Sequence, residues 1–141
     1  MIETERLLLR EYTMDDFDAL YEIMSDAETM QHYPAPFDEA RTGRWIEWNL
    51  ENYARYGFGL WAVVLKETGE FIGDCGITIQ NIDGEKLPEI GYHIHKKSGD
   101  MAMQKKPRRP SEIGLLRIRI IRHCTRTANI RMRHHTKPQK L

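Results

Sequence analysis

The sequence predicts a single domain of the mixed α+β or α/β class, in which a strand and two helices precede a mostly antiparallel sheet. Three observations predict this. Apolar residues recur at helical spacing between residues 14 and 57, and from Gly59 the spacing changes to the period of two that strands show. A chain of 141 residues can also enclose one modest hydrophobic core, but hardly two.

The first predicted elements are a short strand and a helix. Residues 6–10 (Arg-Leu-Leu-Leu-Arg) have the pattern of a strand between charges. Thr13 and Asp16 then form the Thr-x-x-Asp pattern of a capping box, which marks the start of a helix. The apolar face of that helix consists of Phe17, Leu20, Tyr21 and Met24.

A second helix is predicted after a proline-containing loop at residues 33–36. Asp38 can cap its first turn, and Gly57 is placed to end it. Its apolar stripe consists of Ile46, Leu50 and Tyr53, with Trp45 and Trp48 on flanking positions.

Three strands complete the predicted order. Residues 60–65 are apolar on both faces, which is typical of a strand covered on both sides. Residues 66–70 form a hairpin turn into a strand whose one face carries Phe71, Cys75, Ile77 and Ile79. After the turn signal Asp83-Gly84, residues 89–95 alternate between Ile90, Tyr92 and Ile94 on one face and Glu89, His93 and His95 on the other.

The composition of the chain changes abruptly at about Lys97. Residues 1–97 hold 9 Lys or Arg against 19 Asp or Glu, whereas residues 98–141 hold 12 against 2. All aromatic residues also precede Ser98, although aromatic side chains supply much of the area that a core buries. We therefore divide the chain into a folded part, 1–97, and a basic, aromatic-free tail, 98–141, which we expect to be poorly ordered.

Composition also argues against several classes of function. No apolar run approaches the ~20 residues that cross a bilayer, and the acidic N-terminus is unlike a signal peptide, so we expect a cytoplasmic protein without membrane contact. The cysteines and histidines lack metal-ligand spacing, and we predict no metal site. The positive charge of the tail is typical of segments that bind nucleic acid. The tail contains no aromatic residue that could stack on a base, so we expect no specific nucleic-acid partner.

Three motifs in the first part resemble a known family. They are 4–10 (Thr-Glu-Arg-Leu-Leu-Leu-Arg), 69–73 (Gly-Glu-Phe-Ile-Gly) and 89–94 (Glu-Ile-Gly-Tyr-His-Ile). In this order the chain is similar to the GNAT superfamily of acyl-CoA N-acyltransferases, in the branch of the ribosomal-protein N-terminal alanine acetyltransferases. The resemblance covers residues 2–97, so it implies the N-terminal half of a GNAT fold, with the other half missing or non-native.

The resemblance implies transfer of an acetyl group from acetyl-CoA to an amine. In the family the backbone of the fourth strand pairs with pantetheine, and a glycine-rich loop that begins the next helix holds the pyrophosphate. In this sequence the backbone of Ile94, His95 and Lys96 would hold acetyl-CoA. The loop should follow Lys97, but residues 98–104 lack its glycine pattern.

The resemblance also indicates candidate residues for the amine. Glu89 is the candidate catalytic base, because the attacking amine must be neutral, and the alternative is a solvated or hydrogen-bonded glutamate. Tyr33 and Trp45 are candidate substrate-binding residues, with core packing as the alternative. His93 shares the face of Glu89, but a strand histidine is more often structural. We interpret Cys75 as a core thiol, because the family transfers the acetyl group directly.

A shifted reading frame would explain both the missing loop and the change in composition. When the third base of each codon is joined to the first two of the next, Met101-Ala102 must encode glycine and Met103-Gln104 must encode alanine. This forced Gly-x-Ala lies where the loop is expected. We therefore expect a truncated and impaired enzyme. The alternatives are a non-catalytic half-domain that forms oligomers through its exposed sheet edge, and a basic-tailed nucleic-acid-binding module.

Overall fold

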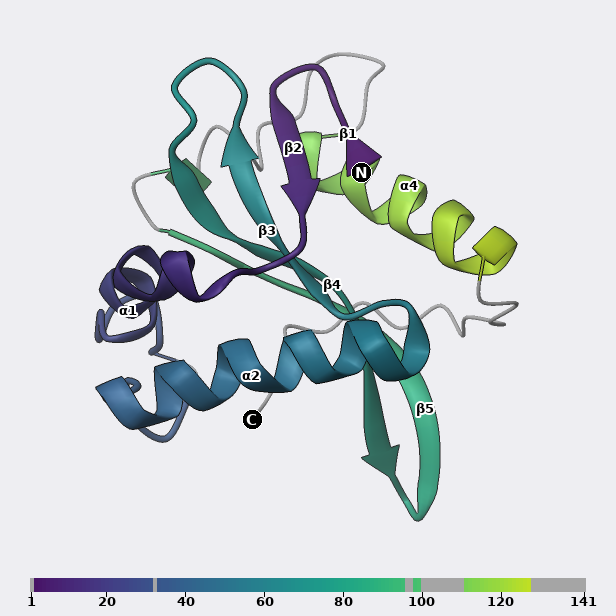
Figure 1. Cartoon of the computed structure of the whole chain (residues 1–141), viewed down its shortest axis with the longest axis horizontal. Coiled ribbons are helices and arrows are strands. Elements are labelled where there is room, and N and C mark those ends of the chain that lie inside the picture. The colour runs from purple at the N-terminus through teal and green to yellow at the C-terminus, as the bar shows by residue number, and fades with distance from the viewer. Residues whose placement is uncertain (1, 32, 96–97, 100–110, 128–141) are drawn as a thin grey trace.

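The computed structural model describes residues 2–31, 33–95, 98–99 and 111–127. Strand, helix, helix and three further strands follow one another in the predicted order (Figure 1). The elements are β1 (Ile2–Glu3), β2 (Leu7–Arg10), the short 3-10 helix η1 (Met14–Asp16), α1 (Phe17–Met24), α2 (Glu39–Tyr56), β3 (Leu60–Leu65), β4 (Phe71–Ile82), β5 (Glu85–Ile94) and α4 (Glu112–Thr127).

The strands form one antiparallel sheet in the order β1-β2-β3-β4-β5. The sheet confirms the predicted mixed class. β1 was not predicted, and β5 begins at Glu85, four residues before the expected start at Glu89. In the described part of the chain β5 has β4 as its only strand neighbour, so one long side of β5 is an edge of the sheet.

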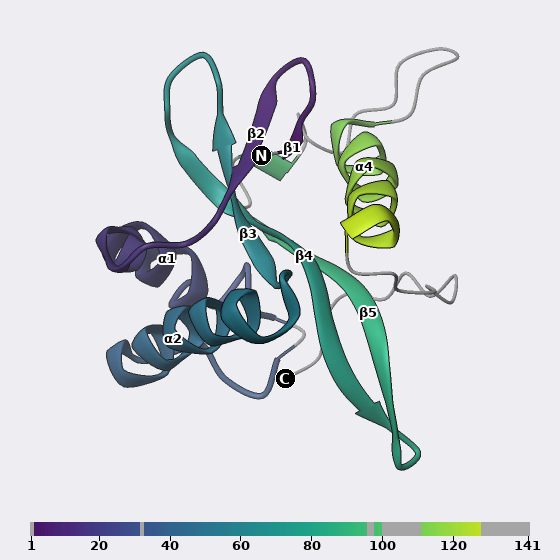
Figure 2. The ribbon, with the colours of Figure 1, turned by 45° about the vertical axis from the view of Figure 1, so that its right-hand side comes forward.

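Two hydrophobic cores lie on opposite faces of the sheet. Figure 2 shows α1 and α2 on one face and α4 on the other. The first core joins α1 and α2 to the sheet through Leu20, Met24, Trp45, Ile46, Leu60 and Ala62, among others. The second joins α4 to the opposite face through Leu7, Leu9, Val63, Cys75, Ile77, Leu116 and Ile120, among others. β3 is therefore covered on both sides, as predicted.

The helix boundaries confirm the predicted signals. Asp16 accepts a hydrogen bond from the backbone N–H of Thr13 in the capping box before α1. Asp38 accepts one from the backbone N–H of Arg41 at the start of α2. Gly57 ends α2 at φ +77°, in the left-handed region that favours glycine.

The centre of the sheet depends on two glycines of β4. A methyl group on Gly76 would lie 2.0 Å from the carbonyl oxygen of Gly59, and one on Gly73 would lie 1.9 Å from that of His93. Neither position has room for a side chain. These close approaches fix how β4 sits between β3 and β5, and so where the side chains of β5 project.

Helix α4 was not predicted. Its buried side chains Ile113, Leu116, Ile120 and Cys124 recur at helical spacing, and they close the second core. The break in composition at Lys97 does not reveal this apolar stripe. The structure thus describes a packed helix within residues 98–141, where we expected none. Among the described helices, none combines the length and the apolar character needed to cross a bilayer.

Candidate functional site

A buried carboxylate, Asp74, lies at the centre of the sheet on the face covered by α1 and α2. Its side chain is 0% exposed. It accepts three hydrogen bonds, at 2.6 Å from the hydroxyl of Tyr12, 3.1 Å from Nε1 of Trp45 and 2.8 Å from Nδ1 of His93. Burial of a charged group is costly unless it is hydrogen-bonded, and these three donors offset that cost.

His93 is placed by the register of the two strands. It lies directly opposite Asp74 in the β4–β5 ladder. Its other ring nitrogen, Nε2, is hydrogen-bonded to the hydroxyl of Tyr33, which comes from the connection between α1 and α2. Trp45 approaches the same ring edge-on, with centroids 5.7 Å apart. Tyr33, His93 and Asp74 therefore form one continuous hydrogen-bonded chain, which we call the Tyr33–Asp74 chain.

Burial and nearby negative charges keep the hydroxyls of Tyr33 and Tyr12 protonated. Burial raises the pKa of Tyr33, and the negative charges of Asp74 and Glu89 raise it further. Burial likewise raises the pKa of Tyr12 well above its ordinary value, with Asp74 adding to the effect. Both hydroxyls are therefore hydrogen donors at neutral pH. Among the described residues, no Lys or Arg forms an ion pair with Asp74, whose carboxylate lies 2.8 Å from Nδ1 of His93.

Glu89, the predicted catalytic base, lies on the same face of β5 as His93. It pairs with Thr78 in the ladder and is partly buried. The negative charge of Glu89 adds to the raised pKa of the Tyr33 hydroxyl, after the effects of burial and of Asp74. The catalytic role of Glu89 stays a prediction.

The two predicted substrate-binding residues have different surroundings. Tyr33 is partly buried in the α1–α2 connection, where its hydroxyl meets His93. Trp45 is only 5% exposed, packs against Phe37 and Trp48, and points its N–H at Asp74. For Trp45 the structure therefore supports the core-packing alternative, while the substrate-binding role of Tyr33 stays a prediction.

Backbone groups at the end of β5 point in two directions, toward β4 and away from it. The N–H of His95 donates to the carbonyl of Ile72 over 2.7 Å, and its own carbonyl accepts from Ser98. Both backbone groups of His95 are thus engaged within the chain. Because alternate residues of an antiparallel strand face opposite neighbours, the backbone groups of Ile94 and Tyr92 point away from β4. The cofactor-binding role of Ile94 and His95 stays a prediction.

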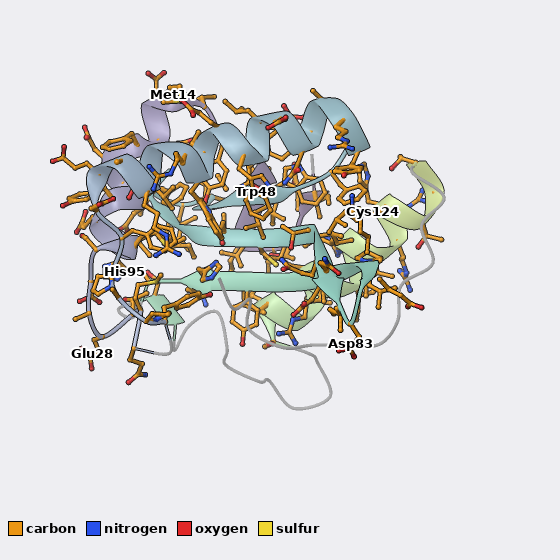
Figure 3. All side chains as sticks on the ribbon, turned by 90° about the horizontal axis from the view of Figure 1, so that it is seen from below. Met14, Glu28, Trp48, Asp83, His95 and Cys124 are labelled. Atoms are coloured by element: carbon orange, nitrogen blue, oxygen red, sulfur yellow. The ribbon has the colours of Figure 1, made fainter. Side chains whose placement is uncertain are left out.

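The end of β5 also approaches the connection after α1. Hydrogen bonds from Thr29 lower the pKa of the Asp26 carboxyl, and the nearby charge of His95 lowers it further. Figure 3 labels His95 and Glu28 toward the same end of the molecule, and Glu28 belongs to this connection. Lys96, the third predicted cofactor-binding residue, lies outside the described residues, as do Met101–Gln104 of the expected pyrophosphate loop.

Among the described residues, no strand pairs with the outward side of β5. On the other face of the sheet, Cys75 is fully buried in the second core, and burial raises the pKa of its thiol to about 12. This confirms its interpretation as a core thiol. In the part of the chain that the structure describes, no group of His, Cys, Asp and Glu side chains is placed to hold a metal ion.

The sequence analysis missed the central position of Asp74. A carboxylate within an otherwise apolar strand is an available signal, because such a residue needs buried donors. Its donors Tyr12, Trp45 and His93 come from distant parts of the sequence, and no local pattern joins them.

The model of the acetyltransferase (GNAT) domain matches residues 6–134 and so extends beyond Lys97, where the sequence analysis ended the resemblance. The chain is 38% identical over 97 residues to protein YkkB of Bacillus subtilis, covering 67% of this chain and 55% of that protein. It is 33% identical over 94 residues to N-acetyltransferase p20 of Bacillus licheniformis, covering 64% and 52%. The chain thus spans about half the length of both relatives.

Solved structures of acetyltransferases also superpose on this chain. An acetyltransferase from Agrobacterium tumefaciens superposes with a TM-score of 0.66 at 26% identity, over 92% of this chain and 68% of that one. The ribosomal L7/L12 α-N-protein acetyltransferase RimL superposes with a TM-score of 0.62 over 91% of this chain and 65% of that one. At 17% identity, the likeness to RimL concerns the fold alone.

Proposed function

The chain belongs to the GNAT acetyltransferase family, and from this we propose that it represents an acetyl-CoA-dependent N-acetyltransferase whose acceptor is an amine of a small molecule or a peptide. The observation that carries the proposal is the juxtaposition at the end of β5. The outward backbone of Ile94 and Tyr92 belongs to the same strand whose face carries Glu89 and His93, and His93 meets the hydroxyl of Tyr33 from the α1–α2 connection.

The two parts of this site would perform different tasks. Backbone groups of Ile94 and Tyr92 would hold the pantetheine arm, so that the thioester lies along the edge of β5. Glu89 would take a proton from the amine, directly or through water, because only the neutral amine is a nucleophile. The neutral amine then attacks the thioester carbonyl. Holding both reactants at one edge supplies the proximity that such a transfer needs.

We further propose that this chain is an impaired form of the enzyme. Residues 98–104 lack the glycine pattern of the family's pyrophosphate loop, so the phosphates of acetyl-CoA would lose their main backbone donors. Titration calorimetry of the purified chain with acetyl-CoA tests this. We expect binding weaker than micromolar, and saturable micromolar binding would contradict the proposal.

Acetyl transfer itself is tested under single-turnover conditions. The chain in excess is incubated with acetyl-CoA and a panel of peptides and polyamines, and acetylated products are followed by mass spectrometry over hours. We expect slow transfer to a subset of the amines, above the rate of a sample without protein. No transfer to any amine would contradict the proposed activity for this chain.

The proposed frameshift is tested by the nucleotide sequence that encodes residues 95–141. We expect the shifted frame to encode the glycine loop and an aromatic strand without a stop codon. A shifted frame that runs into stop codons would remove the hypothesis, and the basic tail would then be a genuine part of the protein. The cytoplasmic location also stays a prediction.

The edge of β5 favours a second candidate function, that of a half-domain that pairs with another copy. Exposed strand edges readily accept a further strand. Gel filtration at low and high salt separates the alternatives. A stable oligomer at both salt concentrations favours the half-domain, whereas salt-dependent retention of added nucleic acid favours a basic-tailed binding module.

A further inference from the structure

We propose that the cleft between the second half of α2 and the β4–β5 hairpin binds a free zwitterionic ligand of the size of a dipeptide. Figure 1 shows this hairpin extending beyond α2. The cleft has a volume of about 210 Å³, and its walls are residues of α2 between Trp48 and Tyr56 and the hairpin residues Ile79, Asn81 and Lys86. The proposal concerns binding alone, so it does not depend on the proposed acetyltransferase activity.

The cleft is separate from the candidate site for acetyl transfer. Lys86 and Glu89 are three residues apart on β5, and successive residues of a strand point to opposite faces. Glu89 shares its face with His93. Lys86 pairs with Asn81 on the other face, and both residues line the cleft. A ligand in the cleft therefore meets a different face of the hairpin from the amine that Glu89 would deprotonate.

Asn52 is a buried amide in the wall of this cleft. Its side chain is only 8% exposed, and among the described residues it has no hydrogen-bond partner. The carboxamide of Asn49 on the same helix is instead hydrogen-bonded to the backbone of Trp45 and Leu60. A buried amide without a protein partner costs free energy unless another molecule takes that place. Because Asn52 lines the cleft, a ligand there can supply the missing partner.

The position of Asn52 on α2 supports binding over packing. Trp48, Asn52 and Tyr56 are four residues apart and lie on one face of the helix. Both aromatic side chains line the cleft beside the amide. A face that served only to pack would carry an apolar residue at position 52, and asparagine is also a poor helix former. Apolar walls around a single placed polar group are typical of small-molecule sites.

The charged groups of the cleft suit a ligand with one charge of each sign. Glu51 and Arg55 come from successive turns of α2, about 6 Å apart along its axis. Lys86 adds a second cation from the opposite wall. In the part of the chain that the structure describes, none of the three forms an ion pair, although Glu51 and Arg55 have the spacing for one. Arg55 lies over the ring of Tyr56 instead, 5.2 Å from its centroid.

A dipeptide matches these groups in length and in chemistry. Its two charged ends are roughly 7 Å apart when it is extended. Its ammonium group can meet Glu51, while its carboxylate meets Arg55 and Lys86. The peptide group between them offers an N–H and a carbonyl to the carboxamide of Asn52. A volume of about 210 Å³ equals the space of roughly seven waters, which suits glycylglycine.

Glycylglycine is the probe for the first test. The purified, nitrogen-labelled chain is titrated with it, and NMR follows the side-chain amide of Asn52 and the indole N–H of Trp48. We expect saturable shifts of both signals with a Kd in the millimolar range. Glycylglycinamide lacks the carboxylate and N-acetylglycylglycine lacks the ammonium group, so each should bind about 10-fold more weakly or worse. The absence of a saturable shift, or equal binding of all the probes, would overturn the proposal.

Two arginines of α2 test the charge of the cleft. Arg55 lines it, whereas Arg44 is an exposed arginine of the same helix that is not part of its walls. We expect Arg55→Gln to weaken glycylglycine binding by about 10-fold, and Arg44→Gln to leave the Kd within about twofold of the unaltered chain. Equal effects of the two variants would mean that only the overall charge of the protein matters, and the site would be wrong.

Two asparagines separate binding from a structural role. Asn52→Leu should abolish the shift of the Trp48 signal and leave the thermal midpoint at or above that of the unaltered chain, because the amide has no partner to lose. Asn49→Leu removes two hydrogen bonds and should lower the midpoint by about 4 °C or more. An equal loss of stability in Asn52→Leu would make Asn52 a structural residue and overturn the proposal, as would unchanged binding of glycylglycine in that variant.

Discussion

The indole N–H of Trp45 donates to Asp74 over 3.1 Å, and this bond ties α2 to the central strands of the sheet. Trp45 comes from the middle of α2, whereas Asp74 lies on β4 opposite His93. The bond therefore fixes the distance between helix and sheet at the point where the candidate site begins.

Replacing Trp45 with Phe should reveal what this hydrogen bond contributes. The variant keeps a ring in the core but removes a donor from a fully buried carboxylate, which should cost roughly 1–3 kcal/mol of unfolding free energy. The matched control is Trp48→Phe, the same change three residues along α2 on a half-buried side chain. Urea unfolding measures both variants. Equal losses would mean that the bond to Asp74 adds nothing beyond ring packing.

Replacing glycine with alanine should have opposite effects on stability at Gly76 and at Gly43. Gly76→Ala places a methyl group 2.0 Å from the Gly59 carbonyl, so β3 and β4 must separate, and we expect a loss of at least about 2 kcal/mol. Gly43→Ala lies within α2, where the added methyl meets the ring of Phe17 at an ordinary 3.7 Å. Alanine favours the helix over glycine, so we expect a gain of about 0.5–1 kcal/mol. Denaturant midpoints of both variants check this pair.

The ion pair of Asp16 and Arg10 should make stability depend on pH. Burial acts to raise the pKa of Asp16, but hydrogen bonds from Arg10 and the backbone of Thr13 outweigh it, so the pKa is lowered. A lowered pKa in the folded state stabilises the fold above the unfolded value near ~4 and loses that effect as pH falls through the folded value.

Asp16→Asn should therefore cost about 1 kcal/mol at neutral pH, a modest figure because the Arg10 side chain is 35% exposed. The difference from the unaltered chain should shrink as the pH approaches about 2–3. Urea unfolding at both pH values measures it. A difference that stayed constant across this range would show that the charge of Asp16 is not the cause.

The two cysteines should be protected from alkylation in the native protein. Burial raises the pKa of Cys75 to about 12 and that of Cys124 to about 11, so few thiolates form at mild pH. A thiol reagent at about pH 8 should label both only after urea is added. Cys75→Ala assigns the remaining signal to Cys124. Rapid labelling of Cys124 in the native protein would show that α4 does not stay on the sheet.

Most elements between Arg6 and Ile94 could be predicted because their signals are local. A capping pair, a left-handed glycine or a change from helical to alternating period lies within a few residues of the boundary that it marks. The cluster around Asp74 could not be predicted, because it joins four distant segments through the strand register. The roles of Glu89 and Tyr33 come from the family resemblance alone and stay predictions, whereas the backbone hydrogen bonds of His95 depend on where β5 ends.

The packing of helix α4 determines whether residues 111–127 belong to the fold. Leu116 is fully buried against the sheet, so Leu116→Ala should create a cavity and cost about 2–4 kcal/mol. Ile118 lies on the same helix but is 43% exposed, and Ile118→Ala should change the unfolding free energy by less than about 0.5 kcal/mol. Urea unfolding followed by circular dichroism compares the two. A large loss in Leu116→Ala alone means that the helix closes the second core, so a shifted frame would still have left a segment that packs. Equal, small effects would instead mean that the folded unit ends near Lys97, as the change in composition indicates.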